Sequence, residues 1–239
     1  MRAARLVSLI LTAHGSADPR SSATVHGVAA VMRRMRPGLD VRVAFCEQNS
    51  PSLHDVLAEL HSEAVVTPLL LADAYHARVD IPAAIGRSGA RVRQADVLGE
   101  DERLIQLLRR RVTESGASER DTDLGIVVVA VGSSRAEANV RTARVAQRLA
   151  AGTRWTTAAA FATGPHPTVA QATASLRGRG VERVLIAPWF LAHGLLTDRV
   201  AEYAHEQDIS MTEPLGAHPL VAATVLDRYD RALTRVAAA

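Results

Sequence analysis

The chain has 239 residues, of which 48% are hydrophobic and only 3% aromatic, and its formal net charge is +3. This length allows one large domain or two small ones, each with a substantial hydrophobic core. Apart from histidine, every basic residue is an arginine, and no basic block is interleaved with aromatic residues, so the composition does not favour nucleic-acid binding. The single cysteine, Cys46, excludes an intrachain disulfide and a metal site built from several thiolates.

The N-terminal segment is similar to a short signal peptide, because Arg2 and Arg5 precede the apolar run LVSLILTA. Cleavage there would remove a strand that belongs to a duplicated pattern, so we interpret the run as part of the fold. No apolar stretch approaches the roughly 20 residues that a membrane-spanning helix needs. We therefore expect a cytoplasmic location and no membrane association.

Apolar runs alternate with helical periodicity along the first half of the chain. The pattern predicts strands at 6–13, 41–46, 65–71 and 91–98, and helices at 21–36, 51–62, 80–88 and 100–112. This alternation is typical of a parallel sheet with helices on both faces. The right-handed crossover rule favours the flavodoxin-like strand order 2-1-3-4, in which ligands bind at the carboxyl ends of the first and third strands.

The second half of the chain repeats the first. Four pairs of segments match at separations of 116 to 120 residues: 9–16 with 126–133, 44–52 with 160–168, 67–76 with 187–196, and 97–101 with 214–218. The polar segment 113–123 lies between the copies and is typical of a linker. We therefore expect an α/β protein of two tandem flavodoxin-like domains, each a parallel four-stranded sheet flanked by helices, at 1–112 and 124–239.

Three polar side chains follow neighbouring strands of the first predicted sheet. His14 comes directly after the first strand, Glu47 after the second, and His76 just beyond the third. Two neutral imidazoles and a carboxylate suit a divalent first-row cation such as Fe, Co, Ni or Zn. They also suit proton abstraction near neutral pH. Any one of them could be an ordinary loop residue, so the prediction depends on all three meeting at one sheet edge.

Other motifs have ordinary structural interpretations. Gly15 allows a sharp turn after the strand, and Ser16 and Asp18 can cap the helix that follows. Asp80, followed by Pro82, matches a helix N-cap with proline in the first turn. No glycine-rich phosphate loop or G-x-S-x-G motif follows a strand, so nucleotide binding and serine hydrolysis are not indicated.

Several segments together resemble the sirohydrochlorin chelatase family, the class II chelatases of cobalamin and siroheme synthesis. AHGSADPRSS (13–22), AFCEQNSPSL (44–53) and PLLLADAYHARVDIP (68–82) resemble its signature segments, and PWFLAHGLLTDRV (188–200) resembles the second half of its two-domain members. The resemblance implies two domains facing across a cleft. It also implies insertion of Co²⁺ or Fe²⁺ into a tetrapyrrole without ATP or NAD, with His14 and His76 binding metal and serving catalysis beside Glu47.

Sirohydrochlorin carries many carboxylates, which arginine binds through two parallel hydrogen bonds. We therefore expect a set of strand-end and helix residues to bind the substrate, with arginines holding its carboxylates and apolar side chains holding the ring. The set is Ser16, Arg20, Arg78, Trp189, Leu195 and Arg199.

The second copy lacks the polar groups of the first. His14 aligns with Val131, Glu47 with Thr163 and His76 with Leu196, so we expect chemistry in the first copy and a wall for the substrate in the second. His193 aligns with Asp73, which leaves open whether His193 reaches the site. The choice among cobalt, iron and nickel and the oligomeric state also stay open, as does the alternative of a non-catalytic metal carrier or tetrapyrrole-binding protein.

Overall fold

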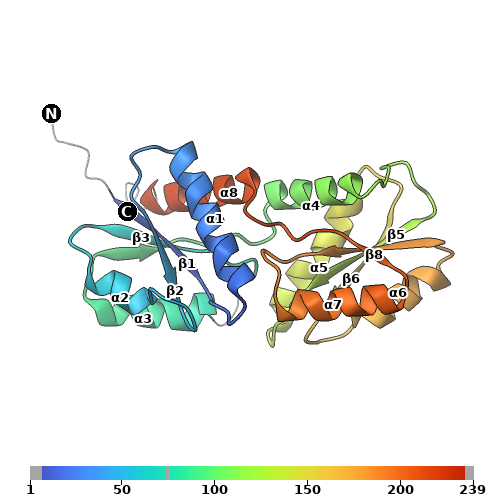
Figure 1. Cartoon of the computed structure of the whole chain (residues 1–239), viewed down its shortest axis with the longest axis horizontal. Coiled ribbons are helices and arrows are strands. Elements are labelled where there is room, and N and C mark those ends of the chain that lie inside the picture. Colours follow the sequence, from blue (N-terminus) through green and yellow to red (C-terminus); the bar gives the residue numbers. More distant parts are fainter. Residues whose placement is uncertain (1–6, 74–75, 235–239) are drawn as a thin grey trace. The chain divides into compact units, whose positions relative to one another are not determined.

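The structure is a computed structural model that describes residues 7–73 and 76–234, without the side chain of His76. It contains two four-stranded parallel sheets, with strand orders β2-β1-β3-β4 and β6-β5-β7-β8 (Figure 1). The predicted fold class and strand order are confirmed. No helix in the described ranges has the length and apolar character needed to span a membrane.

The first sheet is built around a fully buried central strand. It consists of β1 (Ser8–Ala13), β2 (Val41–Phe45), β3 (Ala64–Pro68) and β4 (Val92–Gln94). β1 is paired in parallel with β2 on one side and β3 on the other, and all its residues are buried. A strand covered on both faces reads as a continuous apolar run, which explains the uninterrupted hydrophobic stretch at the start of the chain.

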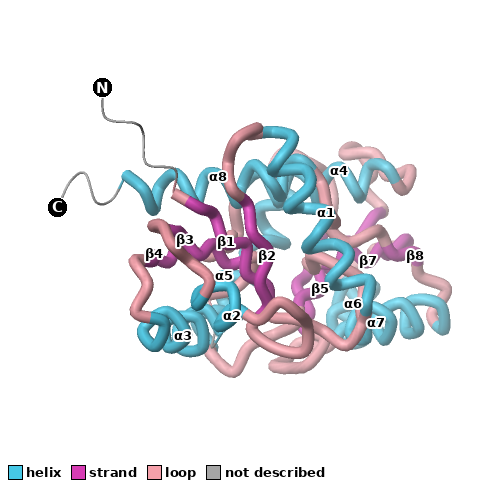
Figure 2. Tube along the Cα trace, turned by 60° about the vertical axis from the view of Figure 1, so that its left-hand side comes forward, coloured by secondary structure: helices cyan, strands magenta, loops and turns pink. Residues whose placement is uncertain are grey.

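Four helices cover this sheet. α2 (Leu53–Ala58) and α3 (Ile81–Ser88) lie on one face, and α1 (Pro19–Met35) and α8 (Pro219–Thr234) lie on the other (Figure 2). Under α2 and α3, the fully buried side chains of Ile10, Val66 and Ile81 pack with Leu57. The packing of Ile81 places the start of α3 beside the carboxyl end of β2.

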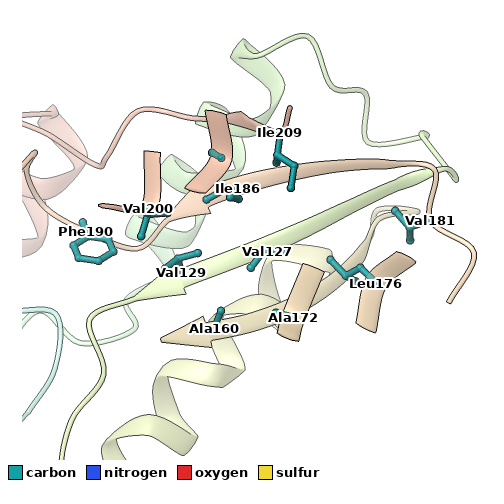
Figure 3. Packing of buried hydrophobic residues seen from close by; sticks show 11 residues of the cluster. Val127, Val129, Ala160, Ala172, Leu176, Val181, Ile186, Phe190, Val200 and Ile209 are labelled. Atoms are coloured by element: carbon teal, nitrogen blue, oxygen red, sulfur yellow. The ribbon is translucent and has the colours of Figure 1, made fainter. Parts of the chain in front are cut away.

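The second sheet has the same plan. It consists of β5 (Leu124–Ala130), β6 (Thr156–Phe161), β7 (Arg183–Pro188) and β8 (Ser210–Met211), with α4 (Glu102–Glu114), α5 (Ala136–Ala150), α6 (Val169–Gly178) and α7 (Leu195–Glu206) around it. Val127 and Val129 of the central strand pack with Ile186 of β7, Leu176 of α6 and Val200 of α7 (Figure 3).

The compact units do not coincide with the two sequence copies. The first unit comprises the chain up to Gly99 together with Ala217 onward, and the second runs from Glu100 to Gly216. The last helix of each copy therefore belongs to the other unit: α4 to the second and α8 to the first. Helical periodicity shows that a helix has an apolar face but not which sheet that face covers, so the sequence could not place these two helices.

The segment expected to be a linker, 113–123, lies inside the second unit. The indole Nε1 of Trp155 donates to the carbonyl of Ser118 at 2.7 Å, and the amide of Arg154 donates to the carbonyl of Glu119 at 2.8 Å. These bonds attach the α4–β5 connection to the start of β6, so this polar segment does not separate the compact units.

α8 is held in the first unit by buried side chains and by arginine. Val221 and Val225 are fully buried. Arg228 donates from Nε to the carbonyl of Val97 at 3.0 Å and from Nη2 to that of Leu98 at 2.7 Å. α4 is fixed in the second unit in a similar way, because Arg109 donates to the carbonyl of Leu149 at 2.9 Å.

We predict that a fragment ending near Thr113 does not fold, because it lacks α8 and leaves α4 without its sheet. Each buried aliphatic side chain lost costs about 2–5 kcal/mol, against a total stability of about 5–15 kcal/mol. Joining Gly99 to Ala217 through a short flexible linker should restore a cooperatively unfolding unit, measured by thermal denaturation with circular dichroism. Cooperative unfolding of the 1–113 fragment would contradict the assignment of α8 to this unit.

Candidate active site

Two main-chain hydrogen bonds place His14 beside Glu47. Beyond the paired strands, the amide of Cys46 donates to the carbonyl of Ala13 and that of Glu47 to the carbonyl of His14, both at 2.9 Å. His14 is partly exposed with its Nδ1 atom buried, and Glu47 is exposed. The predicted meeting of these two residues at the carboxyl edge of the first sheet is therefore present in the backbone itself.

Gly15 makes this approach possible. Its φ is +103°, and a Cβ atom built there would lie 1.8 Å from the carbonyl oxygen of Glu47. Asn49 completes the turn, because its Oδ1 accepts a 2.7 Å hydrogen bond from the amide of Ser16. Only glycine fits here, since any side chain would push the segment of Glu47 away from His14.

We predict that Gly15→Ala lowers the free energy of unfolding by about 4 kcal/mol or more, because positive φ and a backbone clash both oppose a side chain. Gly38→Ala is the matched control, since Gly38 has φ +89° but nothing within 4 Å of an added Cβ. Its cost should be about 1–2 kcal/mol from φ alone. Equal losses in denaturant unfolding of the two variants would show that the contact with Glu47 is not a constraint.

His76 begins a π-helical turn, η1 (His76–Asp80), that runs directly into α3. Its side chain lies outside the described part of the chain, so its meeting with His14 and Glu47 stays a prediction. Pro82 has no N–H to donate to an α-type bond, which accounts for the wider turn before it. Asp80 has helical φ and ψ of −69° and −47°, and its side chain makes no capping hydrogen bond. Asp80 therefore stands at the expected N-cap position of α3, with Pro82 in the first turn, but without the capping hydrogen bond.

Cys46 lies close enough to Asp80 and Glu47 to be affected by their charges. Burial, together with the charges of Asp80 and Glu47, raises the pKa of the Cys46 thiol to about 11. The thiol is therefore protonated at neutral pH and is a poor nucleophile. Its surroundings place Asp80 at the same edge as Glu47, a neighbour that the helix-cap interpretation did not anticipate.

Cys46 should therefore alkylate slowly. At pH 8, a thiol with a pKa of about 11 has about 100-fold less thiolate than one at the ordinary value of 9.0. Iodoacetamide labelling followed by mass spectrometry measures this, and Asp80→Asn and Glu47→Gln should each speed labelling by lowering the thiol pKa. If Cys46 were labelled at the rate of a free thiol, and neither substitution changed that rate, the burial of Cys46 near Asp80 and Glu47 would be contradicted.

The three predicted substrate residues of the first unit are engaged in their own loops. The Oγ of Ser16 accepts a hydrogen bond from the amide of Asp18 at 3.1 Å. Arg20 pairs with Asp18 at 2.6 Å, and Nε of Arg78 pairs with Asp73 at 2.8 Å. Both arginines are exposed. A substrate carboxylate would therefore share each guanidinium with an aspartate.

Of the three predicted substrate-binding residues in the second unit, two are exposed and one is buried. Leu195 is 64% exposed, and Arg199, four residues further along α7, is exposed as well. Trp189 is only 2% exposed and packs in the core after β7, where its amide donates to the carbonyl of Val129 at 2.7 Å. The predicted contact of Trp189 with substrate is not supported, because the side chain is buried in this structure.

The second copy keeps the turn of the first without its polar groups. Gly132 has φ +96°, and a Cβ there would lie 1.9 Å from the carbonyl oxygen of Gly164. The amide of Thr163 donates to the carbonyl of Val131 at 3.0 Å, which matches the bond between Glu47 and His14. Val131 is 42% exposed. This edge of the second sheet therefore presents an apolar residue where the first presents an imidazole.

Two residues that contact the candidate residues or their turn, Asn49 and Glu213, carry no motif that predicts these contacts. Asn49 stands in the turn sequence EQNSP, and Glu213 pairs with His193 across 2.7 Å. Among the described side chains, which do not include that of His76, no group of three or more His, Cys, Asp and Glu residues is arranged to hold a metal ion.

The fold and this edge define a class of duplicated α/β proteins in which the first copy carries a histidine and a carboxylate at the turn after its first two strands, where the second copy has valine and threonine. The chain belongs to the CbiX family, whose model matches residues 8–115 and again residues 125–232. The two matches follow the sequence copies and not the compact units.

Three known proteins illustrate the relationship. Sirohydrochlorin cobaltochelatase of Priestia megaterium is 23% identical over 245 residues, covering 95% of this chain and 80% of that protein. Sirohydrochlorin ferrochelatase of the same organism is 24% identical, covering 88% and 85%. The solved structure of SirB from Bacillus subtilis with Fe³⁺ superposes with a TM-score of 0.81 at 19% identity over 94% of each chain, which shows that the fold is shared.

Proposed function

We propose that this protein inserts Co²⁺ or Fe²⁺ into sirohydrochlorin without hydrolysing ATP. The observation that carries the proposal is the main-chain hydrogen bond that holds His14 and Glu47 side by side at the carboxyl edge of a CbiX sheet, beside the carboxyl end of β3. Relatives along most of the chain bear the names of both a cobaltochelatase and a ferrochelatase, which supports the reaction class and both metals as substrates.

The chemistry of metal insertion suits these residues. The hydrated cation must lose water, and two pyrrole N–H groups must lose their protons. In this proposal the imidazoles of His14 and His76 hold the cation and release it readily, because neutral imidazole is a good ligand for borderline divalent metals. Glu47 takes up a proton, a role that its exposed carboxylate allows. Nothing in this sequence of steps requires ATP or NAD.

Substrate orientation is assigned to the exposed charged and apolar residues. Arg20 and Arg78 would bind carboxylates of the tetrapyrrole, with the Ser16 turn positioning Arg20 through Asp18. Leu195 and Arg199 of the second unit are exposed and stay predicted substrate contacts. Trp189 is left out of this set because it is buried.

Metal insertion can be followed directly by the absorbance change of sirohydrochlorin with Co²⁺ and with Fe²⁺. Wild-type protein should exceed the spontaneous rate with at least one of them. We predict that His14→Ala and His76→Ala each reduce this acceleration about 100-fold or more, whereas Glu47→Gln reduces it about 10-fold. His54→Ala is the matched control, since His54 is exposed on α2 and should be silent.

A metal carrier would give a different result. It would bind Co²⁺ and lose that binding in His14→Ala, yet wild-type protein would leave the insertion rate at its spontaneous value. Wild-type rates in either histidine variant would contradict the assignment of the metal site.

A further inference from the structure

The loop that carries Glu47 contains a strained residue. Gln48 has φ +59°, in the left-handed region that residues with a Cβ atom seldom adopt. Its side chain is exposed, so side-chain packing does not account for this conformation. Such strain persists only where the surrounding structure holds the residue, and it gathers at functional sites. Another part of the loop must therefore hold Gln48 in this conformation.

Asn49 closes this loop through both its main chain and its side chain. Its amide donates to the carbonyl of Glu47 at 2.7 Å, which forms a tight turn around Gln48. Its Oδ1 accepts a hydrogen bond from the amide of Ser16 at 2.7 Å. Together with the 2.9 Å bond from the amide of Glu47 to the carbonyl of His14, these bonds form a closed circuit between the loop after β1 and the loop after β2. Of the three bonds, the one to Ser16 is made by a side chain.

The second copy lacks both the strained residue and the asparagine of this loop. Gly164 and Pro165 stand at their two positions. Gly164 has φ +90°, which glycine adopts without steric strain. The amide and the hydroxyl of Thr163 still donate to the carbonyl of Val131, at 3.0 and 2.7 Å. The bond between the two strand ends therefore forms without an asparagine where glycine takes the left-handed position.

The amide that Asn49 binds has a different partner in the second copy. Ser133, which aligns with Ser16, donates from its amide to Oδ1 of Asn139 on α5 at 2.8 Å. Nδ2 of Asn139 donates in turn to the carbonyl of Ser133 at 2.6 Å. The second copy thus fastens its turn to its own helix, whereas the first copy fastens the turn to the loop of Glu47. The scaffold needs a partner for this amide, but it does not need one from this loop.

We propose that Asn49 is a positioning residue for Glu47 in metal insertion. The inference rests on the proposed function, in which the carboxylate of Glu47 takes up a pyrrole proton while the nitrogen keeps the electron pair of the N–H bond. The bond from Asn49 to the amide of Ser16 holds the loop against the strain at Gln48, and so keeps Glu47 beside His14. Without that bond, Gln48 relaxes to negative φ and moves Glu47 away from His14.

Amide hydrogen exchange, followed by NMR on the full chain, tests this positioning without substrate. Asn49→Ala should lower the protection of the Glu47 amide about 10-fold or more, because the loop leaves the carbonyl of His14. Asn49→Ala combined with Gln48→Gly should return the protection to within about threefold of wild type, since glycine keeps positive φ without strain. Asn139→Ala is the matched control, because it removes the same kind of bond from the second copy and should leave the Glu47 amide protected.

Steady-state Co²⁺ insertion shows whether this position matters for turnover. Asn49→Ala should lower kcat about 10-fold, the loss predicted for Glu47→Gln, while KM for sirohydrochlorin and Kd for Co²⁺ stay within about twofold of wild type. Asn49→Ala combined with Glu47→Gln should also lower kcat about 10-fold and not about 100-fold, because both changes disable one group. Asn49→Ala combined with Gln48→Gly should recover kcat to within about threefold of wild type. Asn139→Ala should keep the wild-type kcat even where it lowers the melting temperature.

The failures are distinguishable. If wild-type protein does not accelerate insertion, the proposed function fails, whatever the exchange rates. If it does, an unchanged kcat or an unchanged protection of the Glu47 amide in Asn49→Ala overturns this inference alone. Additive losses in the double variant with Glu47→Gln, or weaker Co²⁺ binding in Asn49→Ala, would overturn it by showing that Asn49 does not act through Glu47. No recovery with Gln48→Gly would overturn the role given to backbone strain.

Discussion

The candidate site depends on the close approach of Gly15 to the carbonyl oxygen of Glu47. A hydrogen atom in place of a side chain lets the chain leaving β1 lie against the chain leaving β2, and the amide of Glu47 then reaches the carbonyl of His14 at 2.9 Å. An imidazole and a carboxylate are thereby set at one sheet edge by main-chain geometry. The main-chain bonds fix where the two side chains begin, without requiring a contact between the side chains themselves.

Both copies keep the glycine turn after the first strand, but the side chains at this turn differ between the copies. Gly132 approaches the carbonyl oxygen of Gly164 as Gly15 approaches that of Glu47, but Val131 and Thr163 stand in place of the polar pair. The second copy instead carries His193 and Glu213 on the loops after β7 and β8. We interpret the two copies as one scaffold that carries different side chains at its strand ends.

Sequence reasoning succeeded where local patterns determine the structure. The continuous apolar run of β1 and the alternation of elements predicted the parallel order, and glycine after a strand predicted the turn that carries His14. Prediction from the sequence failed for features that depend on tertiary packing. The apolar face of α8 does not say which sheet it covers, the predicted strand at 91–98 is paired only over Val92–Gln94, and Trp189 is buried rather than exposed at the sheet edge. The pairing of His193 with Glu213 joins loops 20 residues apart, so no local motif revealed it.

The central claim is that the metal chemistry belongs to the first copy because of two side chains on a shared scaffold. The most direct measurement is the initial rate of Co²⁺ insertion into sirohydrochlorin by the double variant His14→Val with Glu47→Thr, which gives the first copy the residues of the second. The account predicts that this rate falls to the spontaneous value, while Val131→Ala with Thr163→Ala keeps the wild-type rate and both proteins keep their melting temperature. Retained activity in the first variant would contradict the account.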